Sequence, residues 1–283
     1  MTERWFTERC AEAGTAFSLA VTETLADERT AYQRIEVFET THFGRLMVID
    51  GFIMLSGRDN FIYHEMMAHP PLYAHAGPQR VAIIGGGDCG TLREVAKHAE
   101  VTEIVQVEID GRVTALAEQF FPELCTANAD PRVTLLFEDG IKWMAARAPE
   151  SLDVIIVDST DPLGPAEGLF GESFHRDCRR CLASGGLFVQ QSESPLLHLE
   201  TIIRPVHHSL RAAGFLDTLT YQFPQPVYPS GWWTATMASK DGLLTGFREE
   251  AVEEKPFETR YYNAAVHRGA MATPEFMWKA LLG

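Results

Sequence analysis

With 283 residues, 46% of them hydrophobic, the chain is long enough to bury a sizeable core in one large domain, alone or with a small second one. Its formal net charge of −15 at pH 7 disfavours nucleic acids and anionic membranes as partners, because neutralising phosphate takes clusters of basic residues that the sequence lacks. A small cationic substrate would suit this charge, although solubility alone can explain an acidic composition.

The first 77 residues are predicted to form a small β-rich domain. Short β-like runs separated by turn residues predict an antiparallel layer made of residues 17–24, 32–40, 45–49 and 52–55. A helix should follow from about Asn60, with Asp59 as its cap, and should end at Pro70-Pro71 because proline interrupts a helix. We place the domain boundary before Pro78.

Residues 78–283 show a different rhythm, in which apolar runs alternate with helical patterns. The predicted strands are residues 81–84, 103–107, 133–137, 154–157, 187–190, 216–221 and 232–238. The predicted helices are residues 91–99, 112–119, 141–146, 173–182 and 201–213. This alternation is typical of an α/β fold with a doubly wound, mostly parallel sheet.

The cysteines and the chain start bear on the compartment. Five cysteines, an odd number spread along the chain, are typical of reduced thiols. Cys178 and Cys181 have metal-ligand spacing, but they fall in a predicted helix without a second pair, so we expect no metal site. The apolar runs are shorter than the roughly 18 residues of a membrane span, and the chain starts with a polar segment. We therefore expect a cytoplasmic protein.

A glycine-rich loop follows the first predicted strand of the larger domain. Residues 85–90 read Gly-Gly-Gly-Asp-Cys-Gly, which satisfies GxGxxG, and Glu108 ends the next strand. Such glycines let the backbone approach a nucleoside, and the acid can bind ribose hydroxyls. Asp88 inside the loop would repel a pyrophosphate, which disfavours NAD and FAD. It would attract the sulfonium and ammonium groups of an S-adenosylmethionine-type molecule.

Two further predicted strands also end in carboxylates. Asp139 precedes Gly140, where an acid can accept from the adenine amine and the glycine leaves room for the ring. Asp158 and Asp161 follow the apolar run 154–157. Each of these acids alone could equally cap a turn. Ligands of open α/β sheets bind beyond the carboxyl ends of strands, so together the acids predict a cation beside a nucleoside. The long loop 158–166 is a candidate lid.

Several motifs, in order along nearly the whole chain, resemble the spermidine synthase family. They are Asp50-Gly51, Tyr63-His64-Glu65-Met66, Gly85-Gly86-Gly87-Asp88, Val107-Glu108-Ile109-Asp110, Asp139-Gly140, the 158–165 loop with Leu169-Phe170, Tyr228-Pro229-Ser230-Gly231 and Tyr261-Tyr262-Asn263. The resemblance implies a Rossmann-like catalytic domain of the S-adenosylmethionine-dependent methyltransferase type. It also implies that the amino-terminal β domain supports a homodimer or homotetramer and completes the active site.

The resemblance implies transfer of the aminopropyl group from decarboxylated S-adenosylmethionine, a co-substrate, to putrescine, with no cofactor. Spermidine and 5′-methylthioadenosine would be the products. Asp158 would be the proton acceptor and Tyr63 its partner. The family pattern assigns donor binding to Gln33, Gly85, Gly87, Asp88, Glu108, Asp139, Gly140 and Pro165. It assigns diamine binding to His64, Asp88, Asp158, Ser159, Thr160, Asp161 and Tyr228.

Three positions depart from the family pattern. Met54 stands where Gln is usual, Asn60 where Glu is usual, and Cys89 where Gly is usual. Met54 replaces a polar contact by a flexible apolar one, which could reshape the acceptor pocket. The preferred diamine length, with cadaverine as an alternative, is therefore open. Cys89 suits the loop unless its backbone requires a positive φ.

Other activities are weighed against this one. A diamine methyltransferase would use intact S-adenosylmethionine, whose carboxylate finds no Arg or Lys in residues 85–90. An NAD-dependent oxidoreductase is disfavoured by Asp88. A non-catalytic polyamine sensor would be expected to have lost Asp158 or Tyr63, and both are present.

Overall fold

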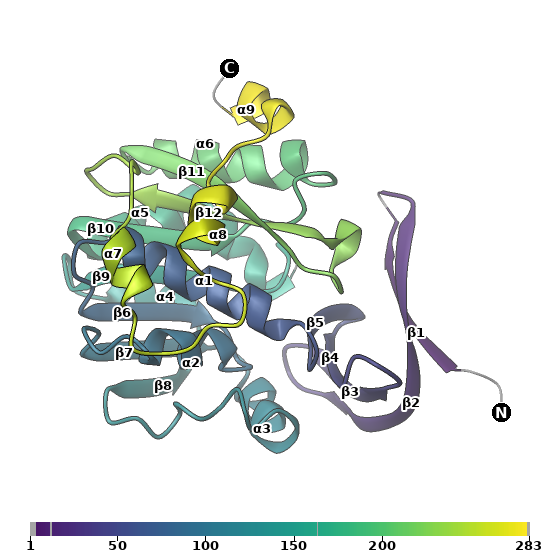
Figure 1. Ribbon diagram of the computed structural model, residues 1–283. Coiled ribbons are helices and arrows are strands. Elements are labelled where there is room, and N and C mark those ends of the chain that lie inside the picture. Colours follow the sequence, from purple (N-terminus) through teal and green to yellow (C-terminus); the bar gives the residue numbers. More distant parts are fainter. Residues whose placement is uncertain (1–3, 12, 163, 282–283) are drawn as a thin grey trace.

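Two sheets organise the protein (Figure 1). The computed structural model describes residues 4–11, 13–162 and 164–281. A five-stranded antiparallel sheet lies near the amino terminus, and a seven-stranded sheet forms the centre of the larger unit. Within the described part, no helix is long and apolar enough to cross a membrane.

The amino-terminal sheet has its strands in sequence order. They are β1 (Arg4–Cys10), β2 (Thr15–Arg29), β3 (Arg34–Thr40), β4 (Arg45–Ile49) and β5 (Phe52–Ser56). Asp50 and Gly51 join β4 to β5 with positive φ at both residues, as a tight hairpin turn requires. The predicted antiparallel layer is thus confirmed. The sequence did not predict β1, because its mostly polar residues are exposed except for buried Glu8.

The larger sheet is mostly parallel, as predicted. Its strand order is β11-β12-β10-β9-β6-β7-β8, and β12 alone of these runs antiparallel to its neighbours. The strands are β6 (Arg80–Gly85), β7 (Glu103–Glu108), β8 (Val133–Phe137), β9 (Leu152–Asp158), β10 (Leu182–Gln191), β11 (Asp217–Pro224) and β12 (Trp232–Ser239). The first strand, β6, lies between β9 and β7, so the strand order reverses beside it. Ligands of such sheets bind at that reversal.

Helices cover both faces of this sheet. Val154 and Ile156 of β9 pack into the same core as α1 (Asn60–Ala74) and α2 (Gly90–Ala96). Ile155 and Val157 pack into the core of the opposite face. That face carries α4 (Gly140–Ala146), α5 (Glu172–Cys181) and α6 (Arg204–Ala212). The continuous apolar run of β9 is explained by this burial on both faces.

Helix α3 (Gly111–Phe120) joins the two units. Its Val113, Leu116 and Ala117 share a core with Ile35 and Met47 of the amino-terminal sheet. The two sheets are therefore held together by apolar packing beside the reversal of strand order. The predicted division into residues 1–77 and 78–283 stays a prediction, and the packing of α1 places that helix with the larger sheet.

The predicted end of α1 was wrong. The helix continues through Pro70 and Pro71 to Ala74. Pro70 has no N–H to donate to the carbonyl of Met66, and that carbonyl instead accepts a hydrogen bond of 2.8 Å from the Tyr221 hydroxyl. Asp59 precedes the helix as predicted, but its side chain does not cap it. It accepts from Ser56 at 2.6 Å instead.

The carboxyl-terminal segment was not predicted. It forms α7 (Glu249–Glu253), α8 (Ala264–Ala270) and α9 (Glu275–Leu281), which are too short to show a helical period. The backbone just before α8 is tied to α1, because Glu65 accepts hydrogen bonds from the N–H groups of Arg260, Tyr261 and Tyr262 at 2.8, 2.9 and 2.8 Å. Shorter helical turns are η1 (Gly164–Phe170), η2 (Leu199–Ile203) and η3 (Pro229–Gly231).

Candidate active site

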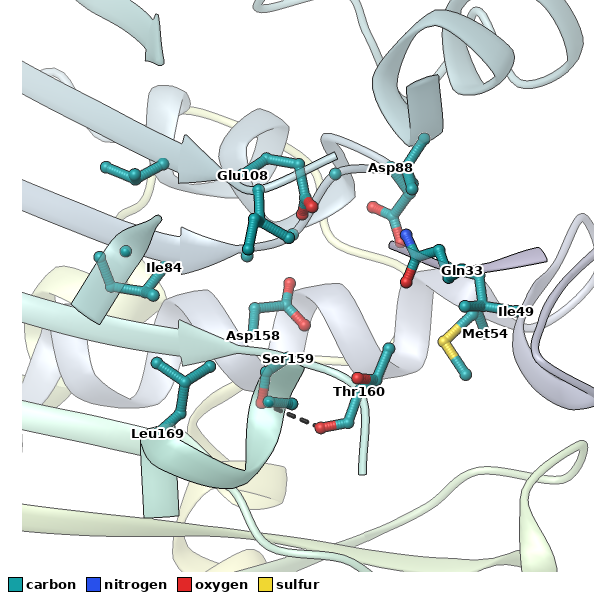
Figure 2. A pocket seen from close by; sticks show the side chains of 18 of the residues that line it. Gln33, Ile49, Met54, Ile84, Asp88, Glu108, Asp158, Ser159, Thr160 and Leu169 are labelled. Atoms are coloured by element: carbon teal, nitrogen blue, oxygen red, sulfur yellow. Dashed lines mark hydrogen bonds between the residues drawn. The ribbon is translucent and has the colours of Figure 1, made fainter. Parts of the chain in front are cut away.

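Four neighbouring strands deliver carboxylates to one edge of the larger sheet. In sheet order β9, β6, β7 and β8, they are followed or ended by Asp158, Asp88, Glu108 and Asp139. A cavity of about 950 Å³, open to solvent, lies at this edge and is lined by all four. Figure 2 shows side chains reaching it from these strand ends, with Gln33 and Met54 of the amino-terminal sheet on another side. The shared edge predicted from the sequence is confirmed.

Asp158 is held by two hydroxyl groups. Tyr63 of α1 donates to Oδ1 at 2.6 Å, and Thr91 of α2 donates to Oδ2 at 2.6 Å. Burial and the negative charge of Asp88 raise the pKa of Asp158, while the two hydroxyls oppose that rise. The side chain of Asp158 therefore does not merely cap a turn.

The glycine loop fits tightly between neighbouring elements. Gly85 has φ of 85°, and a Cβ there would lie 2.2 Å from the carbonyl oxygen of Asp158. A Cβ on Gly90 would lie 2.1 Å from the His64 ring. These positions exclude side chains, so the loop can lie directly against Asp158 and His64. Gly85 and Gly87 both line the cavity, as predicted.

Cys89 does not meet the condition on which we expected it to suit the loop. Its φ is 66°, in the left-handed region that costs roughly 1–2 kcal/mol for a residue with a side chain. The side chain is buried, and Sγ lies 3.7 Å from the Gly87 carbonyl oxygen. A hydrogen bond with Cys125, together with burial, raises the pKa of the Cys89 thiol. Glycine, the residue that the family resemblance leads us to expect here, would adopt the conformation without strain.

Asp88, which is partly buried, pairs with the buried His64. His64 Nε2 lies 3.2 Å from Asp88 Oδ1, and Gly90 N–H donates to the same oxygen at 2.7 Å. Burial acts to lower the pKa of His64, but the charge and hydrogen bond of Asp88 outweigh it and raise that pKa. Asp88 faces the cavity, whereas His64, predicted to bind the diamine, lies behind Asp88 and does not line it.

Glu108 and Asp139 differ in their local roles. Glu108 Oε1 accepts from the Asp110 N–H at 2.8 Å, and burial raises the pKa of Glu108 to about 7. Asp139 caps α4, because its Oδ1 accepts from the N–H groups of Ile141 and Lys142. A capping role was the alternative to ligand binding for these acids, and Asp139 has that role. Asp139 also lines the cavity beside Gly140.

Of the two other predicted donor residues, Gln33 is placed in full and Pro165 only in part. Gln33 lines the cavity, and its Nε2 donates to Asp110 at 3.1 Å. Pro165 falls in η1, but its side chain lies outside the described part of the structure.

A second cavity, of about 360 Å³, continues from the first. The two share the lining residues Met54, Tyr63, Ser159, Thr160 and Tyr228. Beyond these the second cavity reaches Asp161 and Glu8. The Tyr228 hydroxyl donates to the carbonyl of Met54, which fixes the backbone at the junction. The predicted diamine residues Ser159, Thr160, Asp161 and Tyr228 therefore lie around one narrow space, together with Tyr63, which was predicted to be catalytic.

Sequence reasoning missed Glu8, which lines the far end of this cavity, and Glu193, a buried acid that is hydrogen-bonded to Asp161 but does not line the cavity. Glu8 of β1 accepts from the Ile53 N–H at 2.7 Å, and burial raises its pKa to about 7. Glu193 follows β10 with φ of 66° and shares a hydrogen bond with Asp161. Burial and the charge of Asp161 raise the pKa of Glu193 well above its usual range.

Two family models match the chain and together cover both of its sheets. Residues 60–248 match the family model described as Spermine/spermidine synthase domain, and residues 4–57 match the Spermidine synthase tetramerisation domain. A protein of Thioalkalivibrio sulfidiphilus named polyamine aminopropyltransferase is 64% identical over 279 residues, which cover 99% of this chain and 98% of the relative. This chain belongs to the spermine/spermidine synthase family. As a member of that family, it is a polyamine aminopropyltransferase of polyamine biosynthesis.

Further relatives agree with the spermine/spermidine synthase assignment. A polyamine aminopropyltransferase of Methylococcus capsulatus is 60% identical over 277 residues, covering 98% of this chain and 96% of the relative. A crystal structure of spermidine synthase in complex with the transition-state analogue AdoDATO superposes with a TM-score of 0.95 at 33% identity, covering 99% of this chain and 96% of the other. Spermidine synthase from Thermotoga maritima gives 0.93 at 33% identity, covering 99% and 95%. The predicted fold, family and enzyme class are confirmed.

Proposed function

We propose that this aminopropyltransferase moves the aminopropyl group of decarboxylated S-adenosylmethionine to putrescine, which gives spermidine and 5′-methylthioadenosine. The observation that carries the proposal is the pair of continuous cavities with Asp158 and Tyr63 at their junction. One cavity has the features of a nucleoside site, and the other is a narrow slot that ends in carboxylates. The structural relative bound to AdoDATO supports the same class of reaction.

The first cavity suits the donor. Glu108 would accept from the ribose hydroxyls, and Asp139 with Gly140 would hold the adenine, between the glycine loop and Gln33. Asp88 would hold the ammonium of the aminopropyl group. Among the described residues that line this cavity there is no Arg or Lys. The carboxylate of intact S-adenosylmethionine would therefore lack a cationic partner, which favours the decarboxylated donor over a methyl donor.

The second cavity suits a diamine. One nitrogen would lie at Asp158 and Tyr63, and the other at Asp161 and Glu8, with Glu193 hydrogen-bonded to Asp161 outside the cavity wall. Burial and the charge of Asp161 raise the pKa of Glu8 and of Glu193. An ammonium placed among them would stabilise their charged forms. The slot should therefore bind a dication more tightly than a neutral amine.

The chemistry needs a proton acceptor. A primary alkylammonium has a pKa of roughly 10.4, so the attacking nitrogen must lose a proton before its lone pair is available. Asp158 would take that proton as the nitrogen bonds to the carbon attached to sulfur. The carbon–sulfur bond breaks, and its electron pair stays on sulfur as a neutral thioether. Because the leaving group and the activated carbon both belong to the donor, the proposed reaction uses no separate cofactor.

Replacing Asp158 by Asn tests this proposal. We expect D158N to lower kcat about 10²- to 10⁴-fold, the usual contribution of a general base, while 5′-methylthioadenosine binding measured by calorimetry stays within a few-fold. The matched control is D153N, because Asp153 lies on the same strand, pairs with Arg80 and does not line the cavity. Near-normal turnover in D158N would mean that another group carries the proton.

A product assay tests substrate identity. The enzyme is mixed with putrescine and either decarboxylated or intact S-adenosylmethionine, and the products are read by mass spectrometry. Spermidine formed only from the decarboxylated donor supports the proposal, whereas N-methylputrescine contradicts it. Parallel reactions with cadaverine and 1,3-diaminopropane measure acceptor length, which depends on Met54 at the junction. If either of these diamines gives a higher kcat/KM than putrescine, that diamine is the preferred acceptor.

We also propose that the chain forms a homodimer or homotetramer through its amino-terminal sheet. Residues 4–57 match a domain that is named for tetramerisation. Among the described strands, β1 pairs only with β2, so one edge of the sheet is open to another copy. Light scattering during size-exclusion chromatography measures the mass in solution, and a monomer at micromolar concentration would contradict this proposal.

A further inference from the structure

Of the two hydroxyl groups that the described structure shows bonded to Asp158, that of Thr91 has no access to either cavity. Its side chain is buried with 0% exposure, and its hydroxyl donates to Asp158 Oδ2 at 2.6 Å. Tyr63, the other hydroxyl partner, lines both cavities, whereas Thr91 lines neither. A substrate can therefore contact Tyr63 directly, but Thr91 can act on the reaction only through Asp158.

We propose that Thr91 is a positioning residue, which fixes the rotation of the Asp158 carboxylate and keeps it ionised so that it can accept the proton of the amine. The inference rests on the proposed role of Asp158 as the base. A carboxylate has about four acceptor positions. The two hydroxyls occupy one on each oxygen, and the remaining positions are left for the N–H groups of the attacking amine.

The charges around Asp158 explain why such a residue is needed. Burial and the charge of Asp88 favour the protonated acid, which could not accept a proton. Of the groups that oppose this, Thr91 has the largest effect, followed by Tyr63 and His64. The titratable groups that face Asp158 are Tyr63 and His64 from α1, Asp88 from the glycine loop, Glu108 from β7 and Tyr228 before η3. Both hydroxyl donors keep their protons throughout the pH range of an assay, because burial and the charge of Asp158 raise the pKa of Tyr63 well above its usual range.

Thr91 could instead matter only for folding, as a buried threonine whose hydroxyl needs a partner. The two roles make different predictions. A structural role changes stability and leaves the pH dependence of the reaction alone. A positioning role changes the pH at which the base ionises, because removing a hydrogen bond to a charged group destabilises the charged form.

The experiment compares Thr91→Val, which keeps the shape and removes the hydroxyl, with Thr91→Ser, which keeps the hydroxyl. Both kcat and kcat/KM for each substrate are measured against pH. In T91V we expect the apparent pKa of the acid limb to rise by about 1 to 2, and the rate below that limb to fall about 10- to 100-fold. The KM for the donor should stay within about 2-fold. In T91S the limb should return close to its original position.

Two results would overturn the proposal. One is a T91V profile that superposes on that of the original enzyme after scaling, and the other is a T91S profile displaced as far as that of T91V. Melting curves and 5′-methylthioadenosine binding report whether each variant is folded. If T91V does not fold, T91A takes its place, and the same displacement is expected of it.

D158N, assayed alongside, separates this inference from the proposed function. If D158N retains near-normal turnover, the base has been misassigned and the inference about Thr91 fails with it. If D158N is inactive but T91V keeps the original acid limb, Asp158 remains the base and only the role of Thr91 is wrong.

Discussion

The two cavities are built in different ways. The donor cavity is formed by turns that directly follow consecutive strands, so Asp88, Glu108 and Asp139 come from successive strand ends. The acceptor cavity is assembled from segments that are far apart in the chain, with Glu8 from the first strand and Tyr228 from beyond β11. The carboxylates of the nucleoside half therefore come from the larger unit, and Gln33 and Met54 of the amino-terminal unit line its other side. The diamine half also needs a carboxylate from the amino-terminal sheet, so it depends on how that sheet docks against the larger unit.

This comparison predicts that substitutions affect one substrate and spare the other. The largest effect is expected for Asp161→Asn, which removes a carboxylate from the end of the acceptor slot. Loss of a hydrogen bond to a charged partner should raise KM for putrescine about 10- to 100-fold, with KM for the donor within about 2-fold. Steady-state kinetics with each substrate varied in turn measures both values. Equal changes in the two KM values would show that the two cavities do not bind their substrates independently.

Glu108→Gln is the counterpart in the donor half. Because its partner is a neutral ribose hydroxyl, we expect a somewhat smaller effect, about a 10-fold rise in KM for the donor. KM for putrescine should be nearly unchanged, and D161N serves as the control in the same assays. If E108Q changes only the affinity for the diamine, Glu108 belongs to the other half.

Glu8 offers the smallest effect, through pH. Its pKa is raised from 4.5 to about 7 in the folded protein, so between these values the folded state binds more protons than the unfolded chain. Its contribution to the free energy of unfolding therefore falls as pH rises through this window. Above about pH 7 the ionised Glu8 should attract the diamine, so KM for putrescine should fall a few-fold. Glu8→Gln should flatten both dependences.

Thermal melting and putrescine kinetics, both recorded between pH 5 and 8, measure these two dependences. The control is Glu23→Gln, because Glu23 is an exposed glutamate of β2. A full pH dependence in E8Q would assign it to Glu108, whose pKa is also about 7. In that case the donor half, and not the acceptor half, would control the response.

The same contrast explains what could be predicted from the sequence. Asp88, Glu108, Asp139 and Asp158 follow apolar runs, and parallel strands bring such positions to one edge whatever the helices do. Glu193 also follows a strand, β10 beside β9, so the same rule would have indicated it. Its positive φ and its hydrogen bond with Asp161 depend on tertiary packing.

Other features were not visible in the sequence. Glu8 lies in a strand whose exposed polar residues hide its period, and the residues that it meets, Ile53 and Asp161, are distant in the chain. Thr91 looks like any helical threonine until Asp158 is placed beside it. The continuation of α1 through Pro70 depends on a hydroxyl that comes from β11, which no local pattern can indicate.

One turn of α1 connects three distant parts of the molecule. Tyr63, His64 and Glu65 are consecutive, and because each residue of a helix is rotated by about 100° from the last, they point in three directions. They bind Asp158, Asp88 and the backbone of residues 260–262. Removing the chain after residue 259 would leave Glu65, which is only 2% exposed, as a buried charge without those three donors. The carboxyl-terminal segment is therefore bonded to the helix that carries Tyr63. Shortening that segment would disturb the position of Tyr63 at Asp158.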